Sequence, residues 1–265
     1  MAILTTPAIV LRRVEHGESS LICTFYTRNY GRLSAIAKGA RRTKSQFAGL
    51  LDIMNYLDIV VYTKETRSVQ TLSGAEYVRP LLHLQQDMQR TAAGLVIIET
   101  IRQAIIGEEP HPEIFDLLTE ALEFLNNTPD SGIPVLWWFH LHLASLLGFH
   151  PDLIRCNQCG APLHDGYFSR NTGQIYCRKC ITNQTGIMRI TNLELRLARY
   201  LLQRPLARID LGAVHKSLGS PSDTGESNEK HIAFRHLTEV LVQYLQYHVE
   251  GIGTLRSVKF FYTLE

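Results

Sequence analysis

An α+β multidomain fold is predicted for this 265-residue chain by three observations. Short β-type segments fill residues 1–80, helical periodicity dominates most of the rest, and four cysteines gather between two helical stretches. A chain of this length usually divides into two or three domains. We therefore predict a β-barrel domain at 1–80, an α-helical domain made of 81–150 and 188–265, and an inserted cysteine element at 151–187.

Residues 1–80 contain five short segments rich in Val, Ile, Leu, Thr and Tyr and separated by glycines: Pro7–Val14, Ser19–Thr27, Arg32–Ala37, Asp58–Lys64 and Ser68–Ser73. Both faces of the second segment are largely apolar, as in the wall of a small barrel. Five strands in so short a stretch favour a five-stranded OB-fold barrel. An SH3-like barrel or a small sandwich would give a similar pattern.

Helical periodicity begins after Pro80. We expect helices over Leu81–Ile106, Pro112–Phe124 and Pro134–Leu147, and the third is so apolar that it should lie in the core. The acidic residues of the chain concentrate here. Residues 1–80 carry a net charge of +5, residues 81–155 carry −7, and residues 156–265 carry +4. Two basic ends flanking an acidic middle support separate domains, and a basic domain suggests a polyanionic partner.

The C-terminal part resumes the helical pattern after the cysteines. Thr191 and Glu194 have the spacing of a capping box, so a helix should begin there. Ser217–Lys230 has almost no apolar residue and is predicted to be an exposed loop, followed by an amphipathic helix over His231–Tyr247.

Four cysteines form two Cys-x-x-Cys pairs, with residues 160–176 between the pairs: Cys156, Cys159, Cys177 and Cys180. This spacing is typical of a zinc site, because two residues between ligands let one tight turn present both sulfurs to one ion. Gly160 suits such a turn, and Gly166–Tyr176 resembles a hairpin. Four thiolates close the coordination sphere, so we predict one structural Zn²⁺ in a zinc-ribbon-like element. The lone Cys23 is expected to pack in the barrel core.

Catalytic patterns are weak in this sequence. His16-Gly17-Glu18 fits the H-x-E part of a zinc deaminase signature, but no Pro precedes either cysteine pair. His140 and His142 lie on the apolar helix, either as ligands or, as we favour, as packed core residues. We find no P-loop, nucleophile elbow or kinase motif, and we predict a protein that is not an enzyme.

A transmembrane or secretory role is not expected. The longest apolar run, Ile133–Gly148, is interrupted by two histidines and is too short to span a bilayer. The first residues carry no basic segment ahead of their apolar stretch and no small-residue cleavage site. We therefore expect a cytoplasmic protein without a membrane partner.

A basic loop follows the third predicted strand and carries four closely spaced cations: Lys38, Arg41, Arg42 and Lys44. The aromatic residues Tyr30 and Phe47 lie close by in the sequence, and Arg12 and Arg13 could extend the patch. Cations suit phosphate contacts and aromatic rings stack on unpaired bases, so on an OB-type barrel this combination favours single-stranded nucleic acid. A solvated basic loop beside core aromatics is the alternative.

A second group of cations lies on the helix after Thr191. Arg196, Arg199 and Arg204 follow the face opposite its leucines and could bind DNA or an acidic peptide, although a solvated face would have the same pattern.

Several of these motifs together resemble the RecO family of bacterial DNA repair and recombination mediators. The matching blocks are Gly17–Leu21, Tyr30–Leu33, Ala37–Arg42, the Leu147–Pro151 run before the first cysteine pair, Phe168-Ser169, and Leu255–Ser257. The resemblance extends over nearly the whole chain. The N-terminal blocks are specific in combination, whereas the cysteines alone are not.

The resemblance implies an OB-fold domain, a helical domain and a zinc element. It also implies binding of single- and double-stranded DNA, annealing of complementary strands, and loading of RecA onto DNA coated by single-strand-binding protein. RecR and single-strand-binding protein are the implied partners, with RecF and RecA as further candidates, and the implied location is the nucleoid. The basic-loop cations carry over as DNA contacts, the four cysteines as zinc ligands, and Arg196, Arg199 and Arg204 become candidates for the partner surface.

Two other classes of function remain open on these residues. A zinc-ribbon nucleic-acid-binding factor in transcription or RNA processing would use the same barrel and metal, and would prefer RNA over DNA. A zinc hydrolase would need an open coordination position on the metal.

Overall fold

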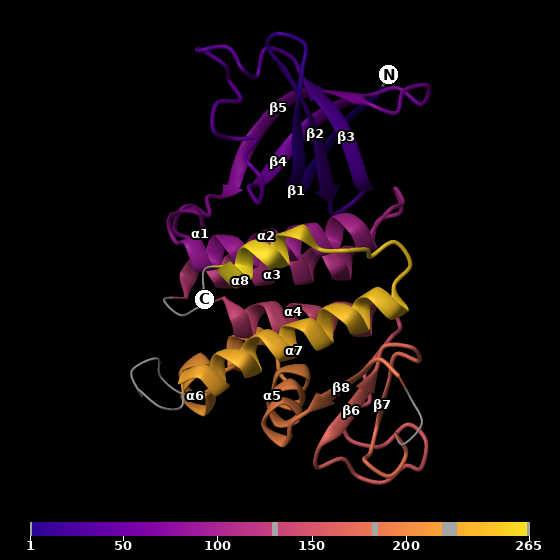
Figure 1. Cartoon of the computed structure of the whole chain (residues 1–265). Helices are drawn as coiled ribbons and strands as arrows, with labels where there is room; N and C mark the ends of the chain where they lie inside the picture. Colours follow the sequence, from indigo (N-terminus) through magenta and orange to yellow (C-terminus); the bar gives the residue numbers. More distant parts are fainter. Residues whose placement is uncertain (1, 129–131, 182–184, 219–226, 264–265) are drawn as a thin grey trace. The chain divides into compact units, whose positions relative to one another are not determined.

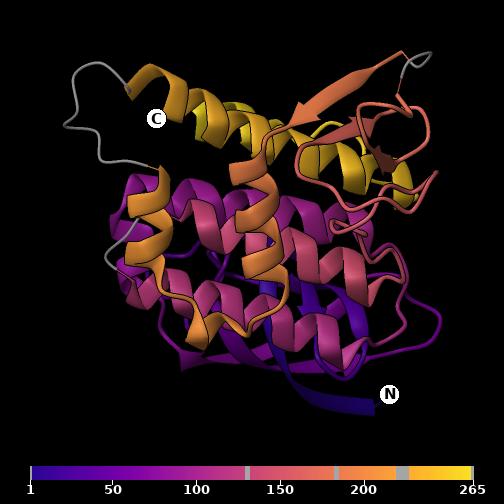
Figure 2. The ribbon, with the colours of Figure 1, turned by 90° about the horizontal axis from the view of Figure 1, so that it is seen from below.

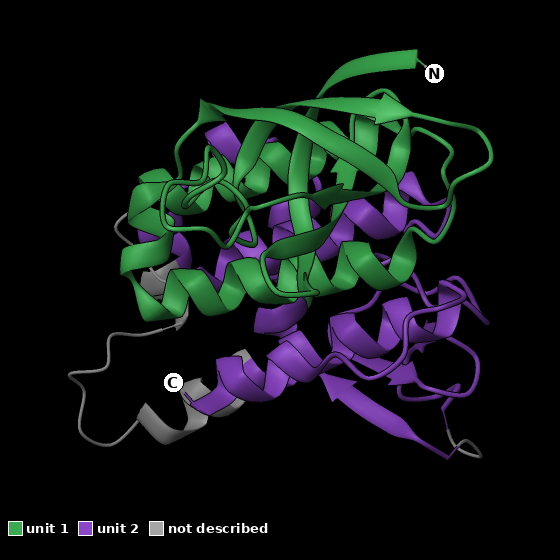
Figure 3. Cartoon of the chain, turned by 90° about the horizontal axis from the view of Figure 1, so that it is seen from above, with its two compact units in different colours: residues 1–127 green, residues 128–265 purple. Residues whose placement is uncertain are grey.

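The computed structural model describes residues 2–128, 132–181, 185–218 and 227–263. The chain forms two compact units, Met1–Asn127 and Thr128–Glu265 (Figure 3). The domain boundaries predicted from the sequence lie where the secondary structure changes. The two compact units instead meet within the helical region, after residue 127. Those boundaries remain a prediction.

Five strands form a closed barrel in the first unit: β1 (Ala2–His16), β2 (Ser20–Thr27), β3 (Gly31–Ala37), β4 (Tyr56–Thr63) and β5 (Gln70–Arg79). Their order around the barrel is β1-β2-β3-β5-β4, with β1 pairing antiparallel to both β2 and β4, and β3 parallel to β5 (Figure 1). This connectivity is that of an OB-type barrel. The predicted α+β fold class with an N-terminal five-stranded barrel is confirmed.

Inward-facing side chains from every strand fill the barrel, and Cys23 is among them as expected. The alternation of β1 changes at a β-bulge between Val10 and Arg12, where Leu11 is the extra residue. Ala8 and Val10 face the core before the bulge. After it, Arg13 lies opposite Cys23 and Glu15 opposite Leu21, so both charged residues share the inward face of the sheet.

Three helices complete the first unit: α1 (Leu82–Gln86), α2 (Met88–Ala104) and α3 (Pro112–Asn127). The predicted single helix over 81–106 is wrong, because Asp87 has an extended backbone and its side chain caps α2 by accepting from the Arg90 N–H. The Phe115 ring of α3 lies 5.9 Å from that of Tyr26 on the barrel. A Cβ at Gly31 would clash with the Glu108 backbone carbonyl, so only glycine fits this turn.

Helices dominate the second unit: α4 (Ile133–Leu146), α5 (Asn192–Leu202), α6 (Leu211–Leu218), α7 (Ser227–His248) and α8 (Arg256–Thr263), with a 3₁₀ turn at Leu206–Arg208. Helix α4 is buried almost all round, as predicted, and Trp137 donates to the Thr238 hydroxyl of α7 at 2.8 Å. The capping box of Thr191 and Glu194 is present. Within the described residues, no helix combines the length and the apolar run that a bilayer crossing needs.

The cysteine element contains a three-stranded antiparallel sheet in the order β7-β6-β8. β6 (Gly166–Ser169) and β7 (Gln174–Tyr176) form the predicted hairpin, and β8 (Ile187–Ile190) is a strand that the sequence did not predict. The sheet lies beside α7 within this unit (Figures 1 and 2), and His248 of α7 contacts the Gly173 carbonyl at 2.9 Å.

The predicted loop at Ser217–Lys230 is partly wrong. Helix α6 continues to Leu218, and α7 begins at Ser227 rather than at His231. The centre of the predicted loop, residues 219–226, lies outside the described residues.

Candidate metal centre and nucleic-acid interface

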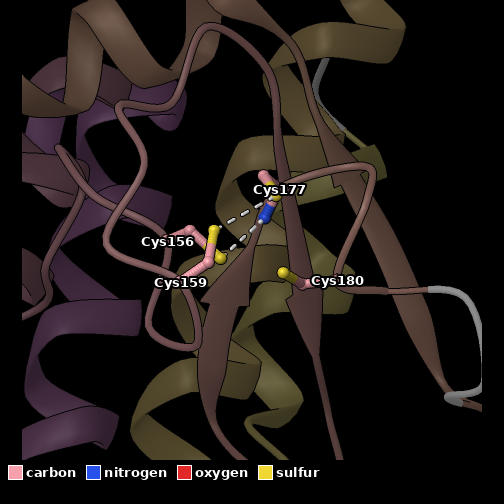
Figure 4. Close-up of side chains that lie close together, drawn as sticks. All are labelled: Cys156, Cys159, Cys177 and Cys180. Atoms are coloured by element: carbon pink, nitrogen blue, oxygen red, sulfur yellow. Dashed lines mark hydrogen bonds between the residues drawn. The ribbon is translucent and has the colours of Figure 1, made fainter.

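The four cysteines come together as predicted. Their sulfur atoms all lie within 4.8 Å of one another, and in the described part of the chain no other group of His, Cys, Asp or Glu has the arrangement of a metal site (Figure 4). The Sγ atoms of Cys159 and Cys177 are 3.8 Å apart. A tetrahedral zinc with Zn–S bonds of about 2.3 Å places its ligands about 3.8 Å apart, so the donor set fits one Zn²⁺.

The backbone around the first pair holds the sulfurs in place. Gly160 has a φ of +70°, and its N–H donates to the Cys156 carbonyl at 2.9 Å, which closes the turn. Asn157 ties this turn to β7, since its side-chain oxygen accepts from the Ile175 N–H at 3.1 Å. The Cys177 N–H donates to the Cys156 sulfur at 3.2 Å, which links the two pairs (Figure 4).

The thiols of the cluster differ in acidity. Burial raises the pKa of Cys156, but backbone N–H groups, that of Cys159 foremost, outweigh it and lower that pKa to about 6. Hydrogen bonding to the neighbouring thiols, Cys159 first, raises the pKa of Cys180 to about 12. One thiolate therefore forms readily in this cluster, and a cation is needed to hold four together. Metal uptake would release protons, so the affinity for metal falls as the pH falls.

The basic loop follows β3 and is exposed to solvent, as predicted. Lys38, Arg41, Arg42 and Lys44 are all exposed. Arg41 forms an ion pair with Glu15 of β1 at 3.0 Å. Among the described residues, none of the ion pairs involves the other three cations, which leaves them available to an anionic partner.

The two aromatic residues predicted beside this loop do not form a stacking surface with its cations. Phe47 is 4% exposed and belongs to the barrel core, so it cannot stack on a base in this conformation. Tyr30 is 39% exposed, but it lies in the turn before β3, whereas Lys38 follows the end of that strand. The length of β3 separates them by roughly 20 Å or more. The structure therefore keeps the cations together, and neither ring is exposed beside them.

A groove of about 460 Å³ beside the basic loop was not predicted. Two arginines and two carboxylates line it together with apolar residues of the β3–β4 connection. Arg41 pairs with Glu15, and Arg13 pairs with Asp52. The partners of each pair lie far apart in the sequence, and no short motif links them.

The three arginines predicted as a ridge on α5 line a second groove, of about 330 Å³, with apolar side chains of α5 and α6. Their roles differ. Arg196 and Arg204 are exposed, and Arg204 lies over the Tyr200 ring at 4.3 Å. Arg199 is half-buried and donates to the backbone carbonyls of Leu153 and Leu163, which fastens the cysteine element to α5. Its description as part of a solvated face is wrong.

The histidines of α4 are core residues. His140 is fully buried, and burial lowers its pKa to about 3, so it stays neutral. His142 donates to the Leu201 carbonyl at 3.2 Å and lies against the Trp138 ring. Neither belongs to the cysteine cluster.

Two protein-family models match the chain. Residues 1–81 match the model described as recombination protein O N terminal, and residues 85–257 match the one described as recombination protein O C terminal. The similar proteins include the DNA repair protein RecO of Chlorobium limicola, which is 41% identical over 61% of this chain and 62% of its own length. The RecO protein of Salinibacter ruber is 35% identical over 66% of this chain and 67% of its own, and that of Acetivibrio thermocellus is 25% identical over 79% and 83%.

The alignment with the Chlorobium limicola protein thus spans less than two thirds of that relative. The C-terminal family model, however, covers more than half of this chain, and the N-terminal model covers the whole barrel. The chain therefore belongs to the recombination protein O family.

Proposed function

We propose that this protein is a DNA repair and recombination mediator. It binds single- and double-stranded DNA, anneals complementary strands, and helps load RecA onto DNA coated by single-strand-binding protein, with RecR as a partner and RecF as a further candidate. Membership of the recombination protein O family supports the repair role, because relatives are named DNA repair proteins.

One observation carries the proposal: a closed OB-type barrel bears an exposed loop with four cations. Strand annealing needs no bond chemistry. It needs neutralised phosphates so that two like-charged strands can approach, with bases left free to pair. Exposed cations with neither Tyr30 nor Phe47 exposed beside them suit this task, since they contact the backbone and do not occupy the bases.

Zinc has a structural role in this proposal. Cys156, Cys159, Cys177 and Cys180 would hold one Zn²⁺ and leave no ligand position for water, which argues against the zinc hydrolase. The metal fixes the two cysteine turns against the sheet. The annealing activity is assigned to the barrel, in the other compact unit.

The groove on α5 is the proposed site for the acidic tail of single-strand-binding protein. An acidic peptide needs cations beside an apolar surface, and Arg196 and Arg204 lie beside Leu193 and Val214. Arg196→Glu should weaken binding of the tail peptide while binding of bare DNA stays nearly intact. Arg199 is less suitable as a probe, because its hydrogen bonds hold the cysteine element in place.

The test is annealing of complementary strands coated with single-strand-binding protein. The wild-type protein should accelerate it, and the variant with Lys38, Arg41, Arg42 and Lys44 all replaced by Ala should not. Four phosphate contacts contribute about 2.8 to the slope of log affinity against log salt, so the quadruple variant should flatten that slope by up to this amount. No acceleration by the wild type would reject the mediator function.

The runner-up function is a zinc-ribbon factor in transcription or RNA processing. The same barrel and cysteines would serve it. Competition between RNA and DNA of one sequence separates the two, since a preference for RNA would favour the runner-up.

A further inference from the structure

The barrel groove described above holds four charged side chains in a neutral arrangement. Arg13 and Glu15 come from the end of β1, Arg41 from the basic loop, and Asp52 from the β3–β4 connection. Leu21 and Ala48 are among the apolar residues that line the groove between them. Two arginines and two carboxylates cancel, so the groove has no net charge although it opens beside the most basic segment of the barrel.

The bulge in β1 turns Arg13 and Glu15 toward the groove. Strict alternation from Val10 would turn Arg12 and Val14 inward, but they lie opposite Thr24 and Ile22, which are not part of the barrel core. The extra residue Leu11 turns Arg13 and Glu15 to the inward face, next to Cys23 and Leu21. Burial raises the pKa of Cys23 to about 11 and the nearby charge of Arg13 opposes that rise, in agreement with this placement.

Each arginine of the groove already has a carboxylate partner. Arg41 contacts Glu15 at 3.0 Å, and it also donates to the Glu18 carbonyl at 3.4 Å. Arg13 contacts Asp52. All four side chains remain accessible, from 36% exposed for Arg41 to 70% for Glu15. Ion pairs this exposed contribute little to stability, so a competing anion can replace the carboxylate.

We propose that Glu15 and Asp52 stand in for phosphates: they hold Arg41 and Arg13 in the DNA-free groove and release them to the backbone of a bound single strand. This inference rests on the proposed function. A carboxylate and a phosphate offer oxygens of the same kind to a guanidinium, so one replaces the other without rebuilding the groove. The exchange weakens DNA binding and eases release of the strand, which an annealing protein must allow once its partner strand has paired.

The proposal predicts a gain of affinity when a stand-in carboxylate is removed. Glu15→Gln keeps the size of the side chain and leaves Arg41 without its competitor. Affinity for a labelled oligo-dT should rise about 1.4- to 5-fold, the range expected for a surface ion pair. The slope of log affinity against log salt should stay close to that of the wild type, because Arg41 contacts a phosphate in both proteins and only its competitor is lost.

The matched control is Glu65→Gln, since Glu65 is exposed in the β4–β5 loop and its replacement removes the same charge from the same unit. Its effect on affinity should be clearly smaller. A double-mutant cycle then locates the effect: in the Arg41→Ala background, Glu15→Gln should give almost no gain. Asp52→Asn with Arg13→Ala repeats the test at the other pair, and melting curves confirm that each variant is folded.

Four results decide whether the proposal holds. Loss of the Glu15→Gln gain in the Arg41→Ala background supports the stand-in role. An equal gain for Glu15→Gln and Glu65→Gln, or a gain that persists without Arg41, overturns it, because Glu15 would then act only through its general charge. No binding of oligo-dT by the wild type at low salt would overturn the proposed function itself.

Discussion

In the barrel, buried side chains from all five strands meet in one core, whereas the residues around the first cysteine pair are almost all exposed. Phe25 and Ile59 are fully buried, while Asn157, Gln158 and Cys159 face solvent. Apolar packing therefore determines the barrel geometry, and the cysteine turns depend on thiolates and backbone hydrogen bonds. One chain thus carries a barrel with its own apolar core and a cluster of four cysteines that could hold a metal ion.

Loss of the metal should give the largest difference between the two regions, because it should affect the cysteine turns and leave the barrel intact. In small zinc modules the free energy of metal binding, about 10–16 kcal/mol, is largely free energy of folding. Cys177→Ser should abolish zinc retention and loosen the cysteine turns, while binding of single-stranded DNA by the barrel stays nearly intact. Metal analysis, thermal melting and DNA titration measure these effects together.

Cys23→Ala is the matched control, because Cys23 lies in the barrel core and is not one of the four clustered cysteines. It should leave the zinc content unchanged. Wild-type protein that is purified without chelator and contains no zinc would refute the metal assignment.

Phe47→Ala should have the next largest effect. Phe47 is buried in the barrel core, so its truncation should lower the free energy of unfolding by about 3–5 kcal/mol. Denaturant unfolding checks this, with zinc content expected to stay at the wild-type level. Tyr30→Ala is the comparison: a stacking role for Tyr30 would appear as a loss of about 1–3 kcal/mol in single-strand affinity with little change in stability. A Phe47→Ala protein of wild-type stability would contradict the core assignment.

Arg199→Ala should have a smaller effect, confined to the second unit. It removes the donors to the Leu153 and Leu163 carbonyls, and hydrogen bonds to charged groups contribute about 1.5–3 kcal/mol. The exposed Arg196 is the matched control, and Arg196→Ala should change stability by at most about 0.5 kcal/mol. Urea unfolding of the two variants should rank them in this order, and the reverse order would remove Arg199 as an anchor of the cysteine element.

The smallest effect should come from a half-buried ion pair between α5 and α7. The Nδ1–H of His236 donates to Glu194 at 2.8 Å, and this hydrogen bond raises the pKa of His236 against the opposing effect of burial. The pair therefore stabilises the fold fully below the unfolded pKa of about 6.5, and this contribution is lost as the pH rises through the higher folded pKa. His236→Gln should lower stability at pH 6 more than at pH 8. An equal loss at both would show that His236 is not charged in the folded protein.

Local signals predicted much of the fold and the cysteine cluster. The Thr191–Glu194 capping box and the cysteine spacing are short motifs, and the structure confirms both. The break at Asp87 had a local signal too, a helix-capping residue, but it was hidden within a continuous apolar periodicity. β8 is only four residues long, too short to show its own alternation.

The interface could be predicted only in part, because its geometry depends on residues that are distant in the sequence. Lys38 to Lys44 are neighbours along the chain and remain so in space. Phe47 is equally close in sequence and yet points into the core. Glu15 contacts Arg41 because β1 pairs with β2 and the bulge in β1 turns Glu15 to the inward face of the sheet. Pairing of this kind appears once strand register is known.

The bulge at Leu11 also determines how β1 tolerates changes in length. Deleting Leu11 would give a regular strand in which Val10 and Arg13 still face inward, so the groove would keep its charges. Inserting one residue between Arg12 and Arg13 would instead turn Arg13 and Glu15 outward and bring the apolar Val14 inward. The number of residues between Val10 and Arg13 therefore decides whether Arg13 and Glu15 face the groove.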